Sequence, residues 1–341
     1  MLKNFLISTA MLLSAVSATA GNATPRLNAP EWRNPLVNHQ NREARHANFF
    51  AFESEDAARA GEKGASSRYL SMEGMWRFNF VKNHQDAPAN FWRSDFDDSK
   101  WENFPVPGLF ELNGHGDRIY KNVGYAWCTT FESNPPYIGE TENYTGSYRR
   151  EFTLPSSWNG QQVIFHVGSA TSNLKVWVNG KYVGYSEDSK IAAEFDITKY
   201  LKKGKNLIAM QIMRWCDGSY LEDQDFWRFT GIAREVYLFA RPKAHIEDVT
   251  IQQDYQDGKG LLTVNVKAAK GTLVEARLED AEGKMVGTGL KQTVENAKAW
   301  SAETPYRHTG SEAGLLGHEL ISRVGVEIWN DYVFLGLFCN G

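Results

Sequence analysis

Apolar residues recur at every second position through the middle of the chain, which is the pattern of half-buried β-strands. The runs Val163–Val167 and Leu174–Val178 each place apolar side chains on one face of an extended backbone. Asn179 and Gly180 follow at once, a dipeptide that favours a tight hairpin, and residues 181–185 can return antiparallel. No repeated helical pattern lies between these runs, which argues against a parallel βαβ architecture. The sequence therefore predicts an all-β fold, and many antiparallel strands of this kind favour a jelly-roll β-sandwich.

A proline interrupts the alternation at Arg241–Pro242, because proline lacks the backbone N–H that a sheet ladder requires. Alternating runs resume beyond it, over Leu262–Val266 and Val274–Leu278. About 100 residues remain after the proline, which is the size of one immunoglobulin-like module. We predict a first domain over residues 21–241 and a second, small β-sandwich over residues 242–341.

The first 20 residues carry a secretory signal pattern. Lys3 gives a short basic start, an apolar stretch runs from Phe5 to Val16, and Ala18–Ala20 forms a small-residue cleavage site. We expect the mature protein to begin near Gly21 and to be exported, either secreted or placed in a bacterial periplasm. No other apolar run approaches the ~20 residues of a membrane helix, so no membrane partner is expected.

The charge and the cysteine content of the chain bear on nucleic-acid binding and on disulfide bonding. A formal net charge of -4 without a long basic run argues against a nucleic-acid partner, whose phosphates demand a Lys and Arg surface. The cysteines Cys128, Cys216 and Cys339 are odd in number and far apart, so no disulfide framework is indicated.

The stretch Arg214–Arg234 has the composition of a polar binding surface. It places four acids, five aromatic residues and three arginines within 21 residues. On an extended backbone Asp223 and Asp225 would share one face, and carboxylates beside aromatic rings suit a polyhydroxylated ligand. The alternative is that both aspartates pair with the arginines in a structural network. We expect Trp215 and Trp227 to be packing residues rather than stacking platforms for a ligand.

The order of motifs along the chain adds a resemblance. The string DGSYLEDQD over Asp217–Asp225, followed by Trp227–Arg228, Gly231–Ile232 and Arg234, is highly specific. It resembles the sugar-binding domain of the β-galactosidases of glycoside hydrolase family 2. Further blocks occur in the family's order, at residues 73–78, 105–107, 119–123, 146–152, 176–180, 186–190 and 193–198. The resemblance runs from about Pro30 to Tyr306, and the last 35 residues depart from it, so the C-terminal part of the second domain is atypical.

The resemblance implies a fold and a reaction. The fold is a galactose-binding-domain-like jelly roll followed by an immunoglobulin-like module, and the reaction is hydrolysis of terminal β-D-galactosides by a retaining mechanism. Retaining glycosidases need two carboxyl groups about 5 to 5.5 Å apart. In the family both are glutamates of a (β/α)₈ barrel that follows the module, and such a barrel takes ~250 residues. A chain of 341 residues leaves no room for it, so we expect no catalytic residue here and no activity from this chain alone. The family's magnesium ion would lie in that barrel.

By the same resemblance two residues are expected to contact substrate. Asn122 is the amide that hydrogen-bonds the galactosyl ring, and Asp225 is the carboxylate that contacts the sugar and binds a sodium ion. The chemistry agrees, since an amide donates and accepts at once and a carboxylate suits a hard cation. Ala126 stands where the family usually has proline, which predicts a less rigid loop.

Other functions stay open at this point. The chain could be a non-catalytic carbohydrate-binding protein that uses its aromatic residues alone. A self-sufficient glycanase would require two glutamates flanking an aspartate, and Glu222 is the only glutamate of the acidic segment. As the N-terminal portion of a β-galactosidase, the chain is expected to bind a β-galactoside or another glycan weakly, and a separate barrel fragment could complement it.

Overall fold

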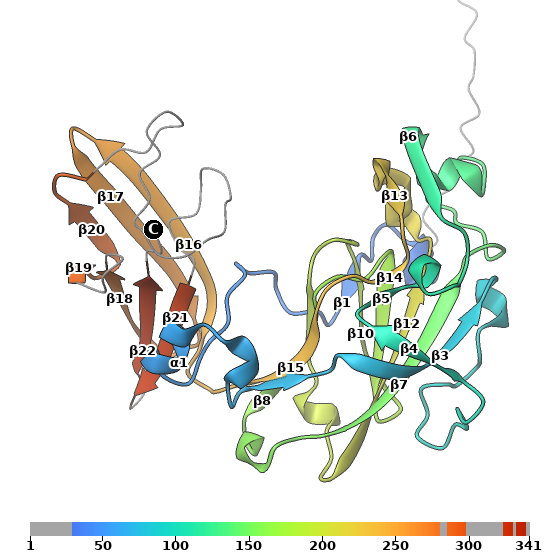
Figure 1. The fold of residues 1–341 in the computed structure, drawn as a ribbon, viewed down its shortest axis with the longest axis horizontal. Coiled ribbons are helices and arrows are strands. Elements are labelled where there is room, and N and C mark those ends of the chain that lie inside the picture. Colours follow the sequence, from blue (N-terminus) through green and yellow to red (C-terminus); the bar gives the residue numbers. More distant parts are fainter. Residues whose placement is uncertain (1–28, 280–284, 298–322, 330–331, 339–341) are drawn as a thin grey trace, which may run out of the picture.

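The computed structural model describes residues 29–279 and 285–297, together with the backbone of two further strands at 323–329 and 332–338. Nearly all regular structure in these ranges is β, which confirms the all-β prediction (Figure 1). The one α-helix among them, α1 (Glu55–Ala60), is capped by the Ser54 side chain and ends at Gly61 with a φ of 69°. None of the helices described is long and apolar enough to cross a membrane. The predicted signal peptide, Cys339 and the segment around Tyr306 lie outside the described residues.

Two antiparallel sheets form the first sandwich. The larger sheet has the strand order β1 (His39–Gln40), β10 (Lys181–Glu187), β9 (Asn173–Val178), β12 (Lys205–Met213), β7 (Thr145–Thr153), β3 (Gly74–Val81) and β4 (Glu102–Val106). The smaller sheet has the order β11 (Ala193–Asp196), β8 (Gln162–Val167), β15 (Val236–Arg241) and β2 (Tyr69–Ser71). Strands distant in the chain lie side by side in both sheets, as in a jelly roll, and the predicted sandwich is confirmed.

Short 3-10 helices occupy the connections between these strands. They span Glu31–Arg33, Lys63–Ala65, His84–Asp86, Phe110–Leu112, Ala126–Thr129, Ser156–Trp158, Thr198–Tyr200 and Asp217–Leu221.

The inward faces of the two sheets share one apolar core. Val176 and Ile208 of the larger sheet and Phe165 and Leu238 of the smaller sheet are fully buried in it. Full burial of such a side chain stabilises the fold by about 1.5 to 3 kcal/mol relative to exposure. The apolar positions that predicted these strands are therefore the positions that fill the sandwich.

The turn between β9 and β10 is the hairpin predicted from Asn179 and Gly180. Their φ angles are 51° and 81°, and a type I′ turn requires two such positive values. The Asn179 side chain also fixes the turn, because its Oδ1 accepts from the Leu207 backbone N–H at 3.0 Å and its Nδ2 donates to the Tyr200 carbonyl at 2.9 Å.

A second group of strands packs around a core of its own. One sheet has the order β16 (Ile246–Gln256), β17 (Lys259–Ala268) and β20 (Lys291–Val294), and the other β19 (Met285–Thr288), β18 (Leu273–Glu279), β22 (Tyr332–Phe338) and β21 (Arg323–Trp329). Strands β18 and β22 pair in parallel, and the remaining pairs are antiparallel. The buried core consists of Ile246, Val249, Leu262, Val264, Ala276 and Leu278. Its immunoglobulin-like identity and the boundary at Arg241–Pro242 stay predictions.

One segment, residues 42–51, runs between the two cores, and we call it the strap. At its start the Glu43 backbone N–H donates to the Glu194 carbonyl of β11 at 2.8 Å. Further on, the Ala47 backbone N–H donates to Asp248 Oδ1 of β16 at 2.9 Å, and Phe49 packs against the second core. The strap is thus bonded to both sandwiches.

Candidate functional site

Two strands leave the first sandwich as a two-stranded antiparallel ribbon, β6 (Ile119–Tyr125) and β13 (Gln224–Arg228). We call this ribbon the arm, and it projects at the top of the sandwich (Figure 1). A smaller pair, β5 (Gly108–Leu109) and β14 (Gly231–Ile232), lies at its base. Both ends of the Arg214–Arg234 stretch are therefore held by the sandwich, while its centre forms the arm.

The pairing within the arm contains a bulge at the predicted site. It is regular from the base as far as Phe226, which lies opposite Lys121. It then shifts, so that Asp225 alone stands opposite the three β6 residues 122–124. Bulges of this kind re-aim side chains beside binding sites.

The bulge brings the two predicted sugar-contacting residues onto neighbouring strands. Asp225 has a φ of 50° and Gly124 a φ of 81°, so both strands bend where they face each other. The side chains of Asn122 and Asp225 are exposed. An amide and a carboxylate are thus exposed on neighbouring strands of the arm, and their contacts with a sugar stay predictions.

Aromatic residues surround Asp225. The Tyr120 hydroxyl donates to Asp225 Oδ1 at 3.3 Å, and the Tyr120 ring lies 5.1 Å from the Trp227 ring. Trp227 is in turn stacked on Phe229, with 5.6 Å between ring centroids and an angle of 2° between planes. Trp215 is 1% exposed, which confirms that it is a packing residue, whereas Trp227 packs on these two rings but is 46% exposed, so whether it also stacks on a ligand stays open. The difference arises because Trp227 lies on a ribbon with no second sheet to cover it.

Asp223 and Asp225 do not share a face. Their φ angles are 61° and 50°, so the backbone between them is not the extended strand that the prediction assumed. The Asp223 side chain is only 4% exposed and points inward to Arg228, whereas Asp225 points to solvent. The alternative that both aspartates pair with arginines is thus correct for Asp223 and wrong for Asp225.

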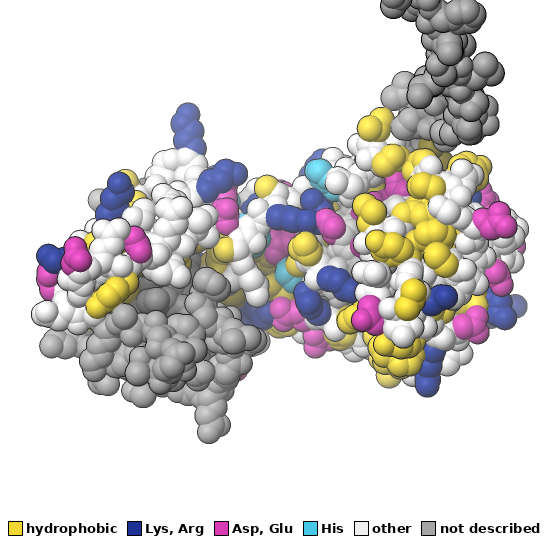
Figure 2. Space-filling view, turned by 90° about the horizontal axis from the view of Figure 1, so that it is seen from above, with side chains coloured by type: hydrophobic (Ala, Val, Ile, Leu, Met, Phe, Trp, Pro, Cys, Tyr) yellow, Lys and Arg dark blue, Asp and Glu magenta, His cyan; other side chains and the backbone are white. Residues whose placement is uncertain are grey.

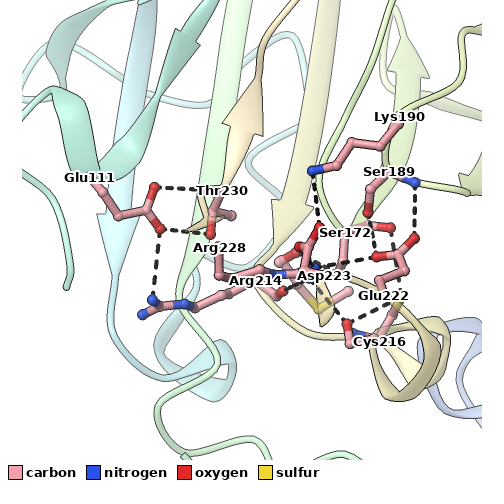
Figure 3. Close-up of polar contacts among 12 residues, drawn as sticks. Glu111, Ser172, Ser189, Lys190, Arg214, Cys216, Glu222, Asp223, Arg228 and Thr230 are labelled. Carbon is pink, nitrogen blue, oxygen red and sulfur yellow. Dashed lines mark hydrogen bonds and ion pairs between the residues drawn. The ribbon is translucent and has the colours of Figure 1, made fainter. Parts of the chain in front are cut away.

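Arg228 anchors the base of the arm. Its side chain is fully buried, its Nη1 donates to Asp223 Oδ2 at 2.6 Å, and its Nη2 donates to the Arg214 carbonyl at 2.6 Å and to Ser219 Oγ at 3.1 Å. The guanidinium also lies over the Trp215 ring, 4.8 Å from its centroid. These contacts hold the loop before β13 in one position (Figure 3).

A second set of bonds ties this loop to the turn after β10. Glu222 accepts from the Ser189 backbone N–H at 3.2 Å and from Ser189 Oγ at 2.6 Å. Lys190 Nζ lies 3.4 Å from Asp223 Oδ1 (Figure 3). Most of the acidic segment is therefore used to fix the arm, and Asp225 is the acid it leaves exposed.

Glu111 binds the residues that follow β13, on the other side of Arg228 from Asp223. Its carboxylate accepts from the Thr230 backbone N–H at 2.8 Å and from Thr230 Oγ1 at 2.9 Å, and Arg214 Nη2 lies 4.0 Å away (Figure 3). Burial is the largest influence on this carboxyl and raises the pKa of Glu111 above its usual range. Its position beneath the arm gives it a structural role.

One group of side chains in the described part of the chain has metal-ligand spacing. Ligand atoms of Glu187, Cys216 and Asp217 all lie within 4.8 Å of one another. Burial raises the pKa of Glu187 to about 9 and also raises the pKa of Asp217. Tyr185 donates its hydroxyl to Glu187 Oε1 at 2.5 Å. This group lies beneath the arm and does not include either predicted site residue.

The predicted sodium site at Asp225 fits the described residues in part. Asp225 offers an exposed carboxylate, and within the described ranges the Tyr120 hydroxyl is its one side-chain partner. Hard cations take several oxygen ligands. Asp225 can therefore supply a ligand, and the others would come from a sugar, from water or from another part of the protein.

Aromatic rings beside the acids were expected, but the part played by Tyr120 and Phe229 and the buried role of Glu111 were not. A signal for Tyr120 was present, because Tyr120 and Asn122 are two apart and share a face if the backbone is extended. No local signal marks Glu111, whose partner Thr230 is 119 residues away in the chain.

Comparison with known proteins gives a family match and several relatives. The family model described as glycosyl hydrolases family 2, sugar binding domain, matches residues 69–242. A β-galactosidase of Priestia megaterium is 35% identical over 305 residues, covering 82% of this chain and 30% of the relative. A β-galactosidase of Oenococcus oeni is 39% identical over 246 residues, covering 71% of this chain and 22% of the relative. The chain thus spans less than a third of the length of these relatives.

Solved structures share the fold. A β-glucuronidase of an uncultured Clostridium species has a TM-score of 0.53 at 20% identity, over 70% of this chain and 41% of that chain. A β-glucuronidase from Ruminococcus gnavus, solved in complex with uronic deoxynojirimycin, has a TM-score of 0.52 at 21% identity, with the same coverage of 70% and 41%.

Proposed function

The chain belongs to glycoside hydrolase family 2 through its sugar-binding domain, and from this premise we propose that it supplies part of the galactoside site of a β-galactosidase. The reaction proposed for the whole enzyme is hydrolysis of terminal β-D-galactosides by a retaining mechanism. The observation that carries the proposal is the bulge of the arm, which presents Asn122 and Asp225 together to solvent.

The two side chains suit the hydroxyl groups of one sugar ring. The Asn122 amide can donate to one hydroxyl oxygen and accept from another, and the Asp225 carboxylate can accept from two neighbouring hydroxyls. The Tyr120 hydroxyl already bonded to Asp225 leaves the second carboxylate oxygen available. A sodium ion bound to Asp225 would add a positive charge that attracts sugar oxygens.

The described part of the arm binds but does not cleave in this proposal. A retaining glycosidase uses two carboxyl groups about 5 to 5.5 Å apart, and Asp225 is the single exposed acid of the described strands β6 and β13. We place the catalytic pair in a barrel that would pack against this end of the sandwich and leave the face of Asn122 and Asp225 open to the sugar. Figure 2 looks down on the end from which the arm projects and shows hydrophobic side chains gathered there.

Affinity for a monosaccharide should be low. Two hydrogen-bonding groups contribute about 0.5 to 1.5 kcal/mol each, or up to about 3 kcal/mol when charged, against an association cost of at least about 4 kcal/mol. We therefore expect galactose and lactose to bind in the millimolar range, as the weak glycan contact of one part of a larger site.

An amide-resolved NMR titration of the chain with galactose tests the proposal. Resonances of β6 and β13 should shift with a millimolar midpoint, and Asn122→Ala or Asp225→Asn should raise that midpoint. Tyr255→Ala is the matched control, because Tyr255 is an exposed aromatic residue of β16 in the other sandwich. Shifts confined to other strands, or unchanged in both site variants, would contradict the proposed function.

Two further tests address the enzyme. The pure chain should show no turnover of a chromogenic β-galactoside, and mixing it with a separately produced barrel fragment should restore turnover. The second candidate, a carbohydrate-binding protein that works alone, is favoured by the exposed aromatic rings and would show micromolar glycan binding.

Export is proposed from the first 20 residues, and mass spectrometry of the secreted product should place its start near Gly21.

A further inference from the structure

Three aromatic rings at the arm lie on the same face as Asp225. The Tyr120 hydroxyl reaches Asp225 Oδ1, the Tyr120 ring lies beside Trp227, and Trp227 is parallel to Phe229. Asn122 follows Tyr120 at a spacing of two, which returns a strand to the same face. One face of the ribbon therefore carries an amide, a carboxylate and two rings, and the ring of Phe229, just beyond the end of β13, continues the row. We call the three rings, Tyr120, Trp227 and Phe229, the aromatic row.

The opposite face of the arm differs. Phe226 alternates with Trp227 along β13 and so points to the other side, where Lys190 Nζ lies 5.2 Å from its ring centroid. Lys190 in turn contacts Asp223, so this face is turned toward the sandwich. The two exposed aromatic residues of β13 thus have different surroundings.

Cross-strand packing explains only part of the aromatic row. A two-stranded ribbon is marginally stable by itself, and the contact between Tyr120 and Trp227 is the type of pair that stabilises it. Yet Tyr120 remains 52% exposed and Trp227 46% exposed, so about half of each side chain faces solvent. Trp227 of β13 and Phe229, which follows the end of that strand, have parallel planes, and this contact does not join the two strands of the arm.

The base of the arm makes the aromatic row rigid before any ligand binds. Arg228, adjacent to both Trp227 and Phe229 in the chain, is fully buried and bonded to Asp223, Ser219 and the Arg214 carbonyl. A preorganised aromatic surface loses little entropy on binding. Flat rings with an apolar body are well suited to the C–H face of a pyranose, while polar groups beside them fix its orientation.

We propose that the aromatic row is a stacking surface for the sugar units that follow the galactosyl unit held at Asn122 and Asp225. The ligand class is a β-linked oligosaccharide with galactose at its non-reducing end. This inference rests on the proposed function, because it takes Asn122 and Asp225 as the galactosyl position and extends from them along the arm.

The test compares a short and a long ligand on the full chain. The probes are methyl β-galactoside and β-1,4-galactotetraose, and binding is followed by NMR through the indole N–H resonances of the tryptophans. The Trp227 resonance is identified by its loss in Trp227→Phe. We expect the tetrasaccharide to bind about tenfold more tightly than the methyl galactoside and to shift the Trp227 resonance.

The variants separate this inference from the proposed function. Trp227→Ala should weaken the tetrasaccharide by more than it weakens the methyl galactoside, so that the tenfold difference is lost, and Trp227→Phe should retain most of it. Phe226→Ala, the exposed neighbour on the other face, should retain all of it. Asp225→Asn should weaken the binding of both ligands. If it weakens neither, the galactosyl position at Asn122 and Asp225 is contradicted, whereas the effect of Trp227→Ala tests the aromatic row.

Two results would overturn the aromatic row as a sugar surface. One is equal affinity of the wild-type chain for the two ligands, and the other is tighter binding of the tetrasaccharide without a shift of the Trp227 resonance. Both use the wild-type chain, so they decide the matter even where Trp227→Ala fails to fold.

Discussion

Individual buried charges, rather than the exposed acid, determine the shape of the candidate site. Asp223 and Asp225 belong to the same acidic segment, yet Asp223 is bonded to Arg228 in the interior and Asp225 is exposed. A buried ion pair is costly to break, since removing one partner leaves the other charge without compensation. The arm therefore depends on Arg228 although Arg228 cannot touch a ligand.

Replacing Arg228 with methionine should lower the free energy of unfolding by about 3 to 5 kcal/mol, because the buried Asp223 loses its closest cation. Arg93→Met is the control, since Arg93 pairs with Asp95 at 2.9 Å on the exposed surface and its removal should leave stability unchanged. Urea unfolding of both variants measures the difference. Equal stability of the two variants would show that the Arg228 contacts do not hold the arm.

Elements of regular structure were predictable where the local pattern sufficed. The alternation in β9 and the Asn179–Gly180 turn are local signals, and the structure contains both. The continuous apolar run of β12 is typical of a strand covered on both faces, and Ile208 faces the core while Ala209 packs against Phe91 on the outside.

The arm itself was not predictable in the same way. Its acidic segment was expected to be an extended strand, but positive φ angles at Asp223 and Asp225 turn the two side chains in opposite directions. Aspartate tolerates this conformation without requiring it, so the local sequence does not specify it. The bulge depends on pairing with β6, which is about a hundred residues earlier, and on Arg228 beneath it.

The close pairing of β5 and β14 at the base of the arm requires a glycine at position 231. It has a φ of 116°, and a Cβ atom there would lie 2.5 Å from the Gly108 carbonyl oxygen and 3.2 Å from Leu109 Cα. Gly231→Ala should therefore separate β14 from β5 and lower stability by about 2 to 4 kcal/mol, from backbone strain and overlap together. Galactose binding at the arm should weaken as well.

Gly160→Ala is the matched control for that prediction. Gly160 also has a positive φ, 78°, but nothing lies within 4 Å of a Cβ placed there. It therefore reports the cost of the backbone angle without the overlap. Thermal unfolding of the two variants should separate them clearly, and similar losses would mean that β5 and β14 can move apart at no cost.

The whole molecule is joined by the strap, and one histidine makes that joint sensitive to pH. His46 Nε2 lies 3.0 Å from Glu194 Oε2, and Glu194 Oε1 lies 2.8 Å from His166 Nδ1. The hydrogen bond to Glu194 raises the pKa of His46, with Asp248 of the second sandwich adding to the effect. Although burial opposes ionisation, the bonds to His166 and His46 lower the pKa of Glu194 to about 2, so it stays charged at neutral pH.

The sign of the pH dependence follows from these shifts. A histidine whose pKa is raised on folding stabilises the folded state fully below its unfolded pKa of about 6.5, and that contribution is lost as pH rises through the folded pKa. Glu194 does not titrate in this window. The contribution of His46, about 1 kcal/mol for a half-buried charge-assisted hydrogen bond, should therefore be present at pH 5.5 and lost by pH 8.5.

Comparing wild type with His46→Gln isolates this contribution, because every other titrating group is common to both chains. The difference in their free energies of unfolding should shrink between pH 5.5 and 8.5 in urea titrations. The strap also carries Phe49 into the second core, so weakening it at high pH should let the two sandwiches unfold in separate steps. A difference that stays constant or grows with pH would show that the bond between His46 and Glu194 does not hold the strap.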